Sequence, residues 1–479
     1  MSFNVDAHRR DAARLLRLAL PILGAQLAQA GMSTVDVMMA GNDSATVLAA
    51  VSVGSSLWIP LMLLMTGTLM GVTPIVAQHL GGERRSAIRP AVHQALWVAL
   101  AFGALSTAAL WYLAAPLFTL MSVPAPVAEA ATDYLQAVAF AMPAVGLYQA
   151  LRAFSDGINH TRPALWISLI GLAVNVPCNY LLIFGGASAA ELLGVESSLL
   201  SQIPALGATG CGMATAIAFW VMCLTMGFYT HRARAYRGLD LWRGFSPPGR
   251  KRIGELLRVG LPVGVAIFTE VTLFAVIALF VAGFGETVVA AHQVALNFTS
   301  LLFMLPLSLG MALTVRVGHT LGQGDGDRAR AVAWNGVMVA LLAAFVIDLI
   351  LLLFARSVVS LYSDNADVQA LAASLMLLAI LYQVSDALQA SMAGALRGYK
   401  DTRIIMVITL FSYWVVGLGG GHLMGRGSDL LLPAFEGLGV YGYWLGLIAG
   451  LTVAALLLGL RLGQTARCYP LAPKEEGAI

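Results

Sequence analysis

The chain of 479 residues is 59% hydrophobic and only 11% charged, and its mean hydropathy is +0.80. Soluble domains carry about 25% charged residues, so this composition argues against a string of soluble domains and indicates a membrane protein. The net charge of +3 is too small to suggest a nucleic-acid-binding protein.

Apolar windows long enough to cross a bilayer, which takes about 20 residues, follow one another along the chain. Twelve are predicted, at 15–40, 47–77, 91–117, 130–154, 163–185, 207–230, 255–284, 289–318, 332–355, 368–394, 404–425 and 438–462. The glycines that interrupt the eleventh window are Gly417, Gly419, Gly420 and Gly421. The sequence therefore predicts an all-α polytopic membrane protein with twelve transmembrane helices.

The second half of the chain repeats the first at an offset of 241 residues. The recurring positions are Leu20 and Pro21 with Leu261 and Pro262, Ala49 and Ala50 with Ala290 and Ala291, Leu80 and Gly81 with Leu321 and Gly322, Gly157 with Gly398, and Thr161 and Arg162 with Thr402 and Arg403. Because each half holds six spans, both halves begin on the same side and form parallel repeats. We assign residues 1–230 to an N-terminal six-helix bundle, 231–252 to a linker and 253–479 to a C-terminal six-helix bundle. Two homologous membrane halves are typical of transporters.

Lysine and arginine residues gather at alternate breaks between the spans. Of the 28, all but two lie at or beside the N-terminus, the breaks after even-numbered spans and the C-terminus. The basic residues at the linker are Arg232, Arg234, Arg237, Arg243, Arg250, Lys251 and Arg252. By the positive-inside rule, both termini and the linker are predicted to be cytoplasmic. A topology signal beside lipid headgroups explains these residues better than a nucleic-acid patch does.

Four carboxylates lie inside predicted spans, namely Asp36, Glu270, Asp348 and Asp386. A charged group at the centre of a transmembrane helix costs about 2.5–3.5 kcal/mol on insertion scales, and such groups usually serve a function. Glu270 and Asp386 are the strongest candidates, because spans 7 and 10 offer no Lys or Arg at mid-membrane depth. Asp348 is a weaker candidate, because it lies nearer the end of its span.

Tyr382 precedes Asp386 by one helical turn, on the same helical face. Carboxylate and phenolic oxygens suit a proton or an alkali cation and suit zinc poorly. A carboxylate held away from water can also exchange a proton near neutral pH. We therefore predict a site for a proton or an alkali cation such as Na⁺ at Glu270, Tyr382 and Asp386.

The N-terminal half has a polar set of its own. Asn175 and Asn179 are one turn apart in span 5, and with Asp36 they could form a hydrogen-bonded cluster. Such a cluster could relay protons or bind a drug, and the sequence does not choose between these roles. The alternative is that the asparagines only hold helices together, as they often do in membranes.

Two further polar residues support these sites. Gln29 is the repeat counterpart of Glu270, so the halves are polar at the same depth but charged differently. Asn297 in span 8 could hydrogen-bond into the region of Glu270 and Asp386. The counterpart of Asp386 is Val145, so this acid belongs to the C-terminal half alone.

Motifs for other chemistry are absent from the sequence. It has no GxxxxGK[ST] loop, which argues against an ATP-driven engine, and no GxSxG, HExxH or HxE…PCxxC motif. The four cysteines form no CxxC pair. No cofactor is expected beyond the coupling cation.

Several runs together resemble the multidrug and toxic compound extrusion (MATE) family in its NorM-type branch: VDVMMAG, LPVGVAIFTEVTLFAV, AAHQVALNF and ALRGYKDTR. The resemblance covers about residues 14–462. It implies a V-shaped pair of six-helix bundles around a central cavity, which expels cationic lipophilic drugs and dyes against an inward Na⁺ or H⁺ gradient. The family's cation site and its polar residues in spans 1 and 5 fall on Glu270, Tyr382, Asp386, Asp36, Asn175 and Asn179.

We therefore expect a drug antiporter of the bacterial inner membrane, acting as a monomer without ATP or nucleic acid. A related flippase for lipid-linked precursors is the nearest alternative, but it calls for a cationic cavity, and the charges inside these spans are acidic. An integral-membrane transferase would need a metal-binding Asp cluster or a nucleophile set, and neither is visible. A channel would need a continuous polar lining, and only scattered polar positions are visible in the spans.

Overall fold

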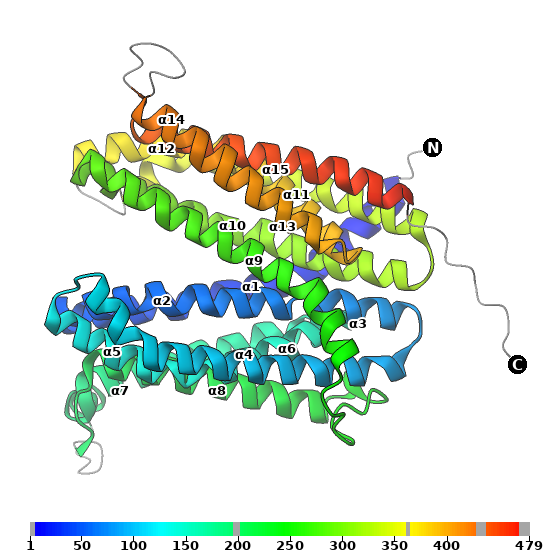
Figure 1. Ribbon diagram of the computed structural model, residues 1–479, viewed down its shortest axis with the longest axis horizontal. Coiled ribbons are helices and arrows are strands. Elements are labelled where there is room, and N and C mark those ends of the chain that lie inside the picture. The colour runs from blue at the N-terminus through cyan, green and yellow to red at the C-terminus, as the bar shows by residue number, and fades with distance from the viewer. Residues whose placement is uncertain (1–4, 195–201, 361–364, 428–436, 469–479) are drawn as a thin grey trace, which may run out of the picture. The chain divides into compact units, whose positions relative to one another are not determined.

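The computed structural model describes residues 5–194, 202–360, 365–427 and 437–468, and most of them are helical (Figure 1). The helices of the first half are α1 (Val5–Asp43), α2 (Ala45–Leu69), α3 (Val72–Gly81), α4 (Arg85–Leu120), α5 (Ala125–Ala139), α6 (Ala141–Gly157), α7 (Arg162–Leu193), α8 (Gly207–Arg232) and the 3-10 turn η2 (Arg234–Tyr236). Those of the second half are α9 (Arg250–Val281), η3 (Ala282–Phe284), α10 (Glu286–Gly322), α11 (Gly326–Val359), α12 (Ala366–Gly398), α13 (Thr402–Leu410), the π-helical η4 (Phe411–Gly419), α14 (Gly420–Arg426) and α15 (Val440–Cys468).

The predicted all-helical membrane fold is confirmed. Within the described residues, eleven helices are long and apolar enough to cross a membrane, and the bent pair α5 and α6 makes a twelfth span if it is counted as one. The eleventh span, where glycines interrupt the apolar pattern, runs without a break from Thr402 to Arg426 and passes through the π-helical segment η4.

A proline explains the 41° bend between α5 and α6. Pro143 has no backbone N–H, so the carbonyl of Ala139 has no donor from its own helix. Thr107 of α4 supplies one, with its hydroxyl 2.8 Å from that carbonyl oxygen. Val384 stands at the repeat-related position, and α12 accordingly runs through it unbroken.

The chain divides into two compact units whose bounds differ from the predicted halves. Unit 1 comprises Met1–Leu23, Ala77–Glu83 and Val265–Ile479, and unit 2 comprises Gly24–Val76 and Arg84–Gly264. The ends of the predicted halves, residues 1–4 and 469–479, lie outside the described residues. The start of α1 and the end of α3 therefore pack with the C-terminal sequence.

An ion cluster anchors the start of α1 within unit 1. Asp11 is buried and accepts hydrogen bonds from the guanidinium groups of Arg316 and Arg328, each at 2.9 Å. Leu15, Ala19 and Ile22 follow on α1 and join the apolar core of unit 1. Neither interaction is visible as a sequence pattern, because the partners lie about 300 residues away.

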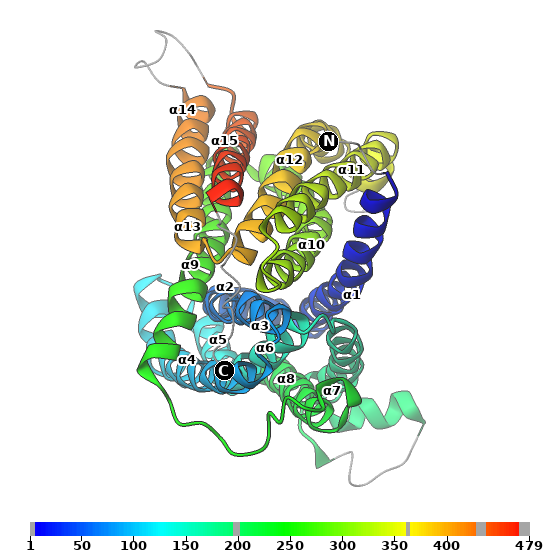
Figure 2. The same ribbon diagram turned by 90° about the vertical axis from the view of Figure 1, so that its right-hand side faces the viewer.

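Close helix packing in unit 1 depends on glycines. Helices α10, α11 and α12 lie side by side (Figure 2). A Cβ atom on Gly310 of α10 would lie only 2.6 Å from the carbonyl oxygen of Ala390 on α12. A Cβ on Gly450 of α15 would lie 2.7 Å from the carbonyl oxygen of Ser412 in η4. These glycines let the backbones approach, as small residues commonly do between transmembrane helices.

The linker after α8 is held against α4 within unit 2. His93 Nε2 lies 2.7 Å from the carbonyl oxygen of Leu241, and its Nδ1 accepts from the backbone N–H of Ser246 at 3.0 Å. Gln94 bonds to the backbone of both Pro247 and Gly249. The linker residues 241–249 are thus hydrogen-bonded to α4 of unit 2.

Candidate functional site

The acidic residues of the C-terminal unit come from different helices. Glu270 lies on α9, and Asp386 and Tyr382 lie one turn apart on α12. Glu270 and Asp386 are close enough to interact electrostatically, and both also act on Tyr382. The structure therefore brings the three predicted residues together.

Asp386 is the least satisfied member of this group. It is 0% exposed, and neither carboxylate oxygen has a hydrogen-bond partner among the described residues. A buried polar group without a partner costs about 1–3 kcal/mol in proteins, and more when it is charged. A buried carboxylate without partners therefore calls for an explanation, and a bound proton or cation is one.

Glu270 differs from Asp386 in being partly exposed. Its side chain lines a pocket between α9, η4 and α15, whose other lining residues are Leu273, Phe274, Tyr413, Gly417, Leu447, Gly450 and Leu451. The walls are apolar except for Glu270 and Tyr413, so the pocket gives a small cation few polar partners besides these two.

Two residues of this region were not foreseen from the sequence. Tyr413 in η4 is buried, interacts electrostatically with Glu270 and Asp386, and has a hydroxyl without a partner among the described residues. Arg397 in the last turn of α12 is buried and interacts electrostatically with Glu270. Arg397 lies beyond the predicted span 368–394, so it is not one of the residues expected at mid-membrane depth.

The polar set of the N-terminal half gathers around Asp36. One carboxylate oxygen, Oδ1, accepts from the side-chain amide of Asn175 at 3.1 Å and from that of Asn179. The other, Oδ2, accepts from the Thr215 hydroxyl of α8 at 2.9 Å. All four residues are buried, and the amide oxygens of both asparagines have no partner in the described part of the chain. Nothing in the sequence distinguished Thr215 from other threonines in the spans.

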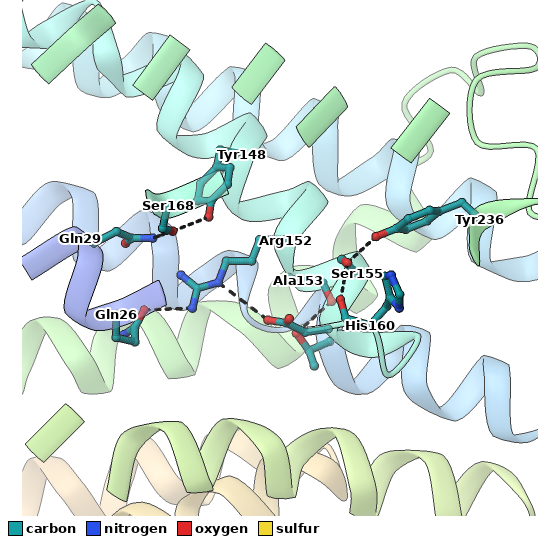
Figure 3. A network of polar contacts seen from close by, with 11 residues as sticks. Gln26, Gln29, Tyr148, Arg152, Ala153, Ser155, His160, Ser168 and Tyr236 are labelled. Atoms are coloured by element: carbon teal, nitrogen blue, oxygen red, sulfur yellow. Dashed lines mark hydrogen bonds and ion pairs between the residues drawn. The ribbon is translucent and has the colours of Figure 1, made fainter. Parts of the chain in front are cut away.

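A second polar network of unit 2 surrounds Gln26 and Gln29 on α1 (Figure 3). Arg152 of α6 donates to the Gln26 amide oxygen at 3.0 Å and lies 3.9 Å from Asp156, one turn along α6. Gln29 donates to the hydroxyl of Ser168 on α7 at 3.2 Å. Gln29 is therefore bound within its own unit.

A separate pair of hydrogen bonds connects Ser155 of α6 to His160 and to Tyr236 of the linker. The Ser155 hydroxyl donates to the carbonyl of His160 at 2.6 Å, so Tyr236, also at 2.6 Å, must be the donor to Ser155 (Figure 3). Burial raises the pKa of Tyr236, which keeps that donor protonated. Burial also lowers the pKa of His160, with nearby Arg162 acting in the same direction.

Two further predicted residues, Asn297 and Asp348, lie on α10 and α11. Asn297 is exposed on α10, whereas Asp386 is fully buried. Asp348 is buried on α11, and its two carboxylate oxygens have no partner among the residues described. Its repeat counterpart is Thr107, whose hydroxyl donates to the carbonyl of Ala139 at the bend between α5 and α6.

Comparison with known proteins gives one family and close relatives. The MatE family model matches residues 21–181 and 262–421, two stretches whose starts are one repeat offset apart. The chain is 44% identical over 461 residues to multidrug resistance protein PmpM of Pseudomonas aeruginosa, covering 96% of this chain and 93% of that protein. It is 44% identical over 455 residues to multidrug resistance protein NorM of Aliivibrio fischeri, covering 95% of each.

Solved structures share the fold. An outward-facing multidrug resistance MATE family transporter of the MOP superfamily superposes with a TM-score of 0.84 at 19% identity, over 96% of each chain. A eukaryotic MATE transporter superposes with a TM-score of 0.81 at 20% identity, over 96% of this chain and 98% of that one. These likenesses extend over nearly the whole chain.

Proposed function

The chain belongs to the MatE family, and on this premise we propose that it exports cationic, lipophilic drugs and dyes in exchange for Na⁺ or H⁺. The names of its relatives, which are multidrug resistance proteins, support drug export. The observation that carries the exchange with a cation is the burial of Asp386 with both carboxylate oxygens unpartnered in the described chain.

The coupling cation binds at Glu270, Tyr382 and Asp386 in this proposal. Their oxygens suit a proton or an alkali cation, and the two carboxylates supply negative charge in a low-dielectric setting. A cationic drug and the coupling cation then oppose each other, because binding of either reduces the negative charge that attracts the other. By linkage each weakens the other by the same free energy, so cation entry from outside favours drug release.

The cluster of Asp36, Asn175, Asn179 and Thr215 has a second role in transport. Its carboxylate and two unpartnered amide oxygens form a group of acceptors, which favours a positively charged guest. That guest is a proton in transit or the cationic group of a drug.

We place the protein in the bacterial inner membrane with its termini and linker in the cytoplasm. The distribution of lysine and arginine supports this orientation. A single chain carries both polar clusters, so a monomer suffices, and neither ATP nor nucleic acid takes part.

The alternatives fit the site less well. A flippase for lipid-linked precursors would need several basic residues to hold pyrophosphate. In the described part of the chain, the cluster around Asp36 has none, and Glu270 and Asp386 supply two carboxylates beside a single arginine, Arg397. A transferase that uses a metal would need a ligand set, and no group of three or more His, Cys, Asp or Glu side chains with that geometry occurs among the described residues.

Efflux measured under separate gradients tests the proposal. Everted membrane vesicles containing the protein are loaded with Na⁺ or acidified, and accumulation of ethidium or norfloxacin is followed. Accumulation driven by at least one of the two gradients is expected. Uptake that requires ATP would refute cation-coupled export. So would the absence of uptake under both gradients in vesicles that contain correctly folded protein.

A further inference from the structure

Gln383 is the most fully buried amide of α12, and no contact described above accounts for it. It is 1% exposed, and neither its amide oxygen Oε1 nor its amide nitrogen Nε2 has a hydrogen-bond partner among the described residues. Burying an amide without compensation costs about 1–3 kcal/mol in proteins. A buried amide whose polar atoms have no partner in the described chain calls for an explanation, such as a bound ion.

The position of Gln383 on the helix places it beside a second buried group without a partner. Asp386 follows three residues later, and side chains at that spacing are neighbours on a helix, with Cβ atoms about 5–6 Å apart. Both oxygens of Asp386 also lack partners in the described chain. The two adjoining side chains thus present three oxygens that accept from no donor.

A metal cation satisfies such a group better than a proton. A proton on Asp386 joins at most one pair of oxygens, and it leaves the remaining acceptor as it was. A small metal cation takes several oxygen ligands at once, including carboxylates and side-chain carbonyls. The free Nε2 group of Gln383 can meanwhile donate to a carboxylate.

The repeat supports treating these residues as one functional group. At the positions related by the offset of 241, Gln383 corresponds to Met142 and Asp386 to Val145. Met142 is buried like Gln383, so the fold accepts an apolar side chain of this length at the equivalent position. At this pair of positions the amide occurs only in the half that holds the acidic site.

We infer that Gln383 is a ligand of a monovalent metal cation, Na⁺, which its Oε1 atom shares with the Asp386 carboxylate. The inference rests on the proposed function, in which Asp386 binds the coupling cation, and it assigns Na⁺ rather than a proton to this site. Gln383 contributes a neutral oxygen, so it adds a ligand without adding a second buried charge next to Asp386.

Binding of ²²Na⁺ to the purified full-length protein tests this assignment. Gln383→Met installs the residue of the other half, and Gln389→Met is the matched control, because Gln389 is a second buried glutamine of α12. Losing even an outer-shell partner typically weakens metal binding by about 10–100-fold, so Gln383→Met should weaken Na⁺ binding at least about tenfold. Gln389→Met should change it less than about twofold, and Gln383→Glu, which keeps an oxygen, should retain binding.

Several results would overturn the inference. Wild-type affinity for Na⁺ in Gln383→Met alongside lost affinity in Asp386→Asn would remove Gln383 from the site. Equal losses in Gln383→Met, Gln383→Glu and Gln389→Met would show a general effect on α12. If the wild-type protein binds no Na⁺ yet drives ethidium efflux with a pH gradient, the metal assignment fails while cation-coupled export stands. If efflux also fails under both gradients, the proposed function fails with it.

Discussion

Thr73 and Thr314, which are related by the repeat offset, make the same hydrogen bond in their own units. The Thr73 hydroxyl donates to the carbonyl of Ala153 at 3.2 Å, and the Thr314 hydroxyl donates to the carbonyl of Gly394 at 2.8 Å. Ala153 and Gly394 are themselves repeat-related. The internal repeat is therefore preserved in atomic contacts as well as in the order of helices.

In both units a glycine beside this hydrogen bond allows two helices to pack closely. A Cβ on Gly157 would lie 2.8 Å from the Cβ of Val76, and a Cβ on Gly398 would lie 2.8 Å from that of Val317. Gly157→Ala and Gly398→Ala are each expected to lower stability by about 1–3 kcal/mol, the usual cost of overpacking. Thermal unfolding of the purified variants in detergent measures the effect.

Gly463→Ala on α15 is the control, because a Cβ there meets no atom within 4 Å in the described part of the chain. Alanine favours a helix by up to about 1 kcal/mol over glycine, so this variant should be as stable as the wild type or more stable. A Gly157→Ala protein as stable as Gly463→Ala would contradict the close packing of α6 against α3.

Much of the fold could be read from the sequence because its signals are local or periodic. Long apolar windows give the spans, and the offset gives the pairing of Gly157 with Gly398 and of Gln29 with Glu270. The bend at Pro143 was not foreseen, because proline is tolerated inside other spans here, for example at Pro262 in α9. Its effect depends on the donor that Thr107 supplies from another helix.

The site was predictable where a carboxylate marks it, or where a polar side chain lies one helical turn from another candidate, as Tyr382 does from Asp386. A carboxylate in an apolar span is conspicuous, and so Asp36, Glu270 and Asp386 could be picked out. Thr215 and Gln383 carry no charge, and their importance depends on which side chains lie opposite or beside them. The anchoring of α1 by Asp11 depends in turn on contacts between residues distant in sequence.

Thr215 gives a prediction for the cluster around Asp36. Thr215→Val keeps the shape of the side chain but removes the donor to Asp36 Oδ2. A hydrogen bond to a charged group contributes about 1.5–3 kcal/mol, which corresponds to about tenfold or more in an equilibrium. Ethidium efflux is expected to fall by about that factor in Thr215→Val and to be retained in Thr215→Ser.

Thr132→Val is the matched control in the same unit. The Thr132 hydroxyl donates to the carbonyl of Ala128 in its own helix. Efflux by this variant should equal that of the wild type. Unchanged efflux in Thr215→Val, with normal amounts of protein in the membrane, would show that this hydrogen bond has no part in transport.

Arg237 allows a direct test of orientation. It lies in the linker after η2 and is exposed, so a cysteine at this position is accessible from the aqueous phase. In a background without Cys468, the exposed native cysteine, Arg237→Cys should react with a membrane-impermeant maleimide in everted vesicles and not in intact spheroplasts. Labelling of intact spheroplasts would place the linker outside and reverse the topology.

The strongest prediction is that the two halves differ in function although they share contacts. The counterparts of Glu270 and Asp386 are Gln29 and Val145. Only the C-terminal half therefore carries two carboxylates within its spans that interact with each other.

Asp386→Asn keeps the size and hydrogen-bonding capacity of the side chain and removes its charge. The cation response of efflux is expected to fall at least about tenfold, or about 1.4 kcal/mol, in Asp386→Asn. In Asp36→Asn the response to the imposed gradient should persist, with a changed rate or drug preference. The two variants are compared by dye efflux under stepped Na⁺ and pH gradients at equal amounts of folded protein. If Asp36→Asn alone loses the cation response while Asp386→Asn retains it, the coupling site belongs to the N-terminal half.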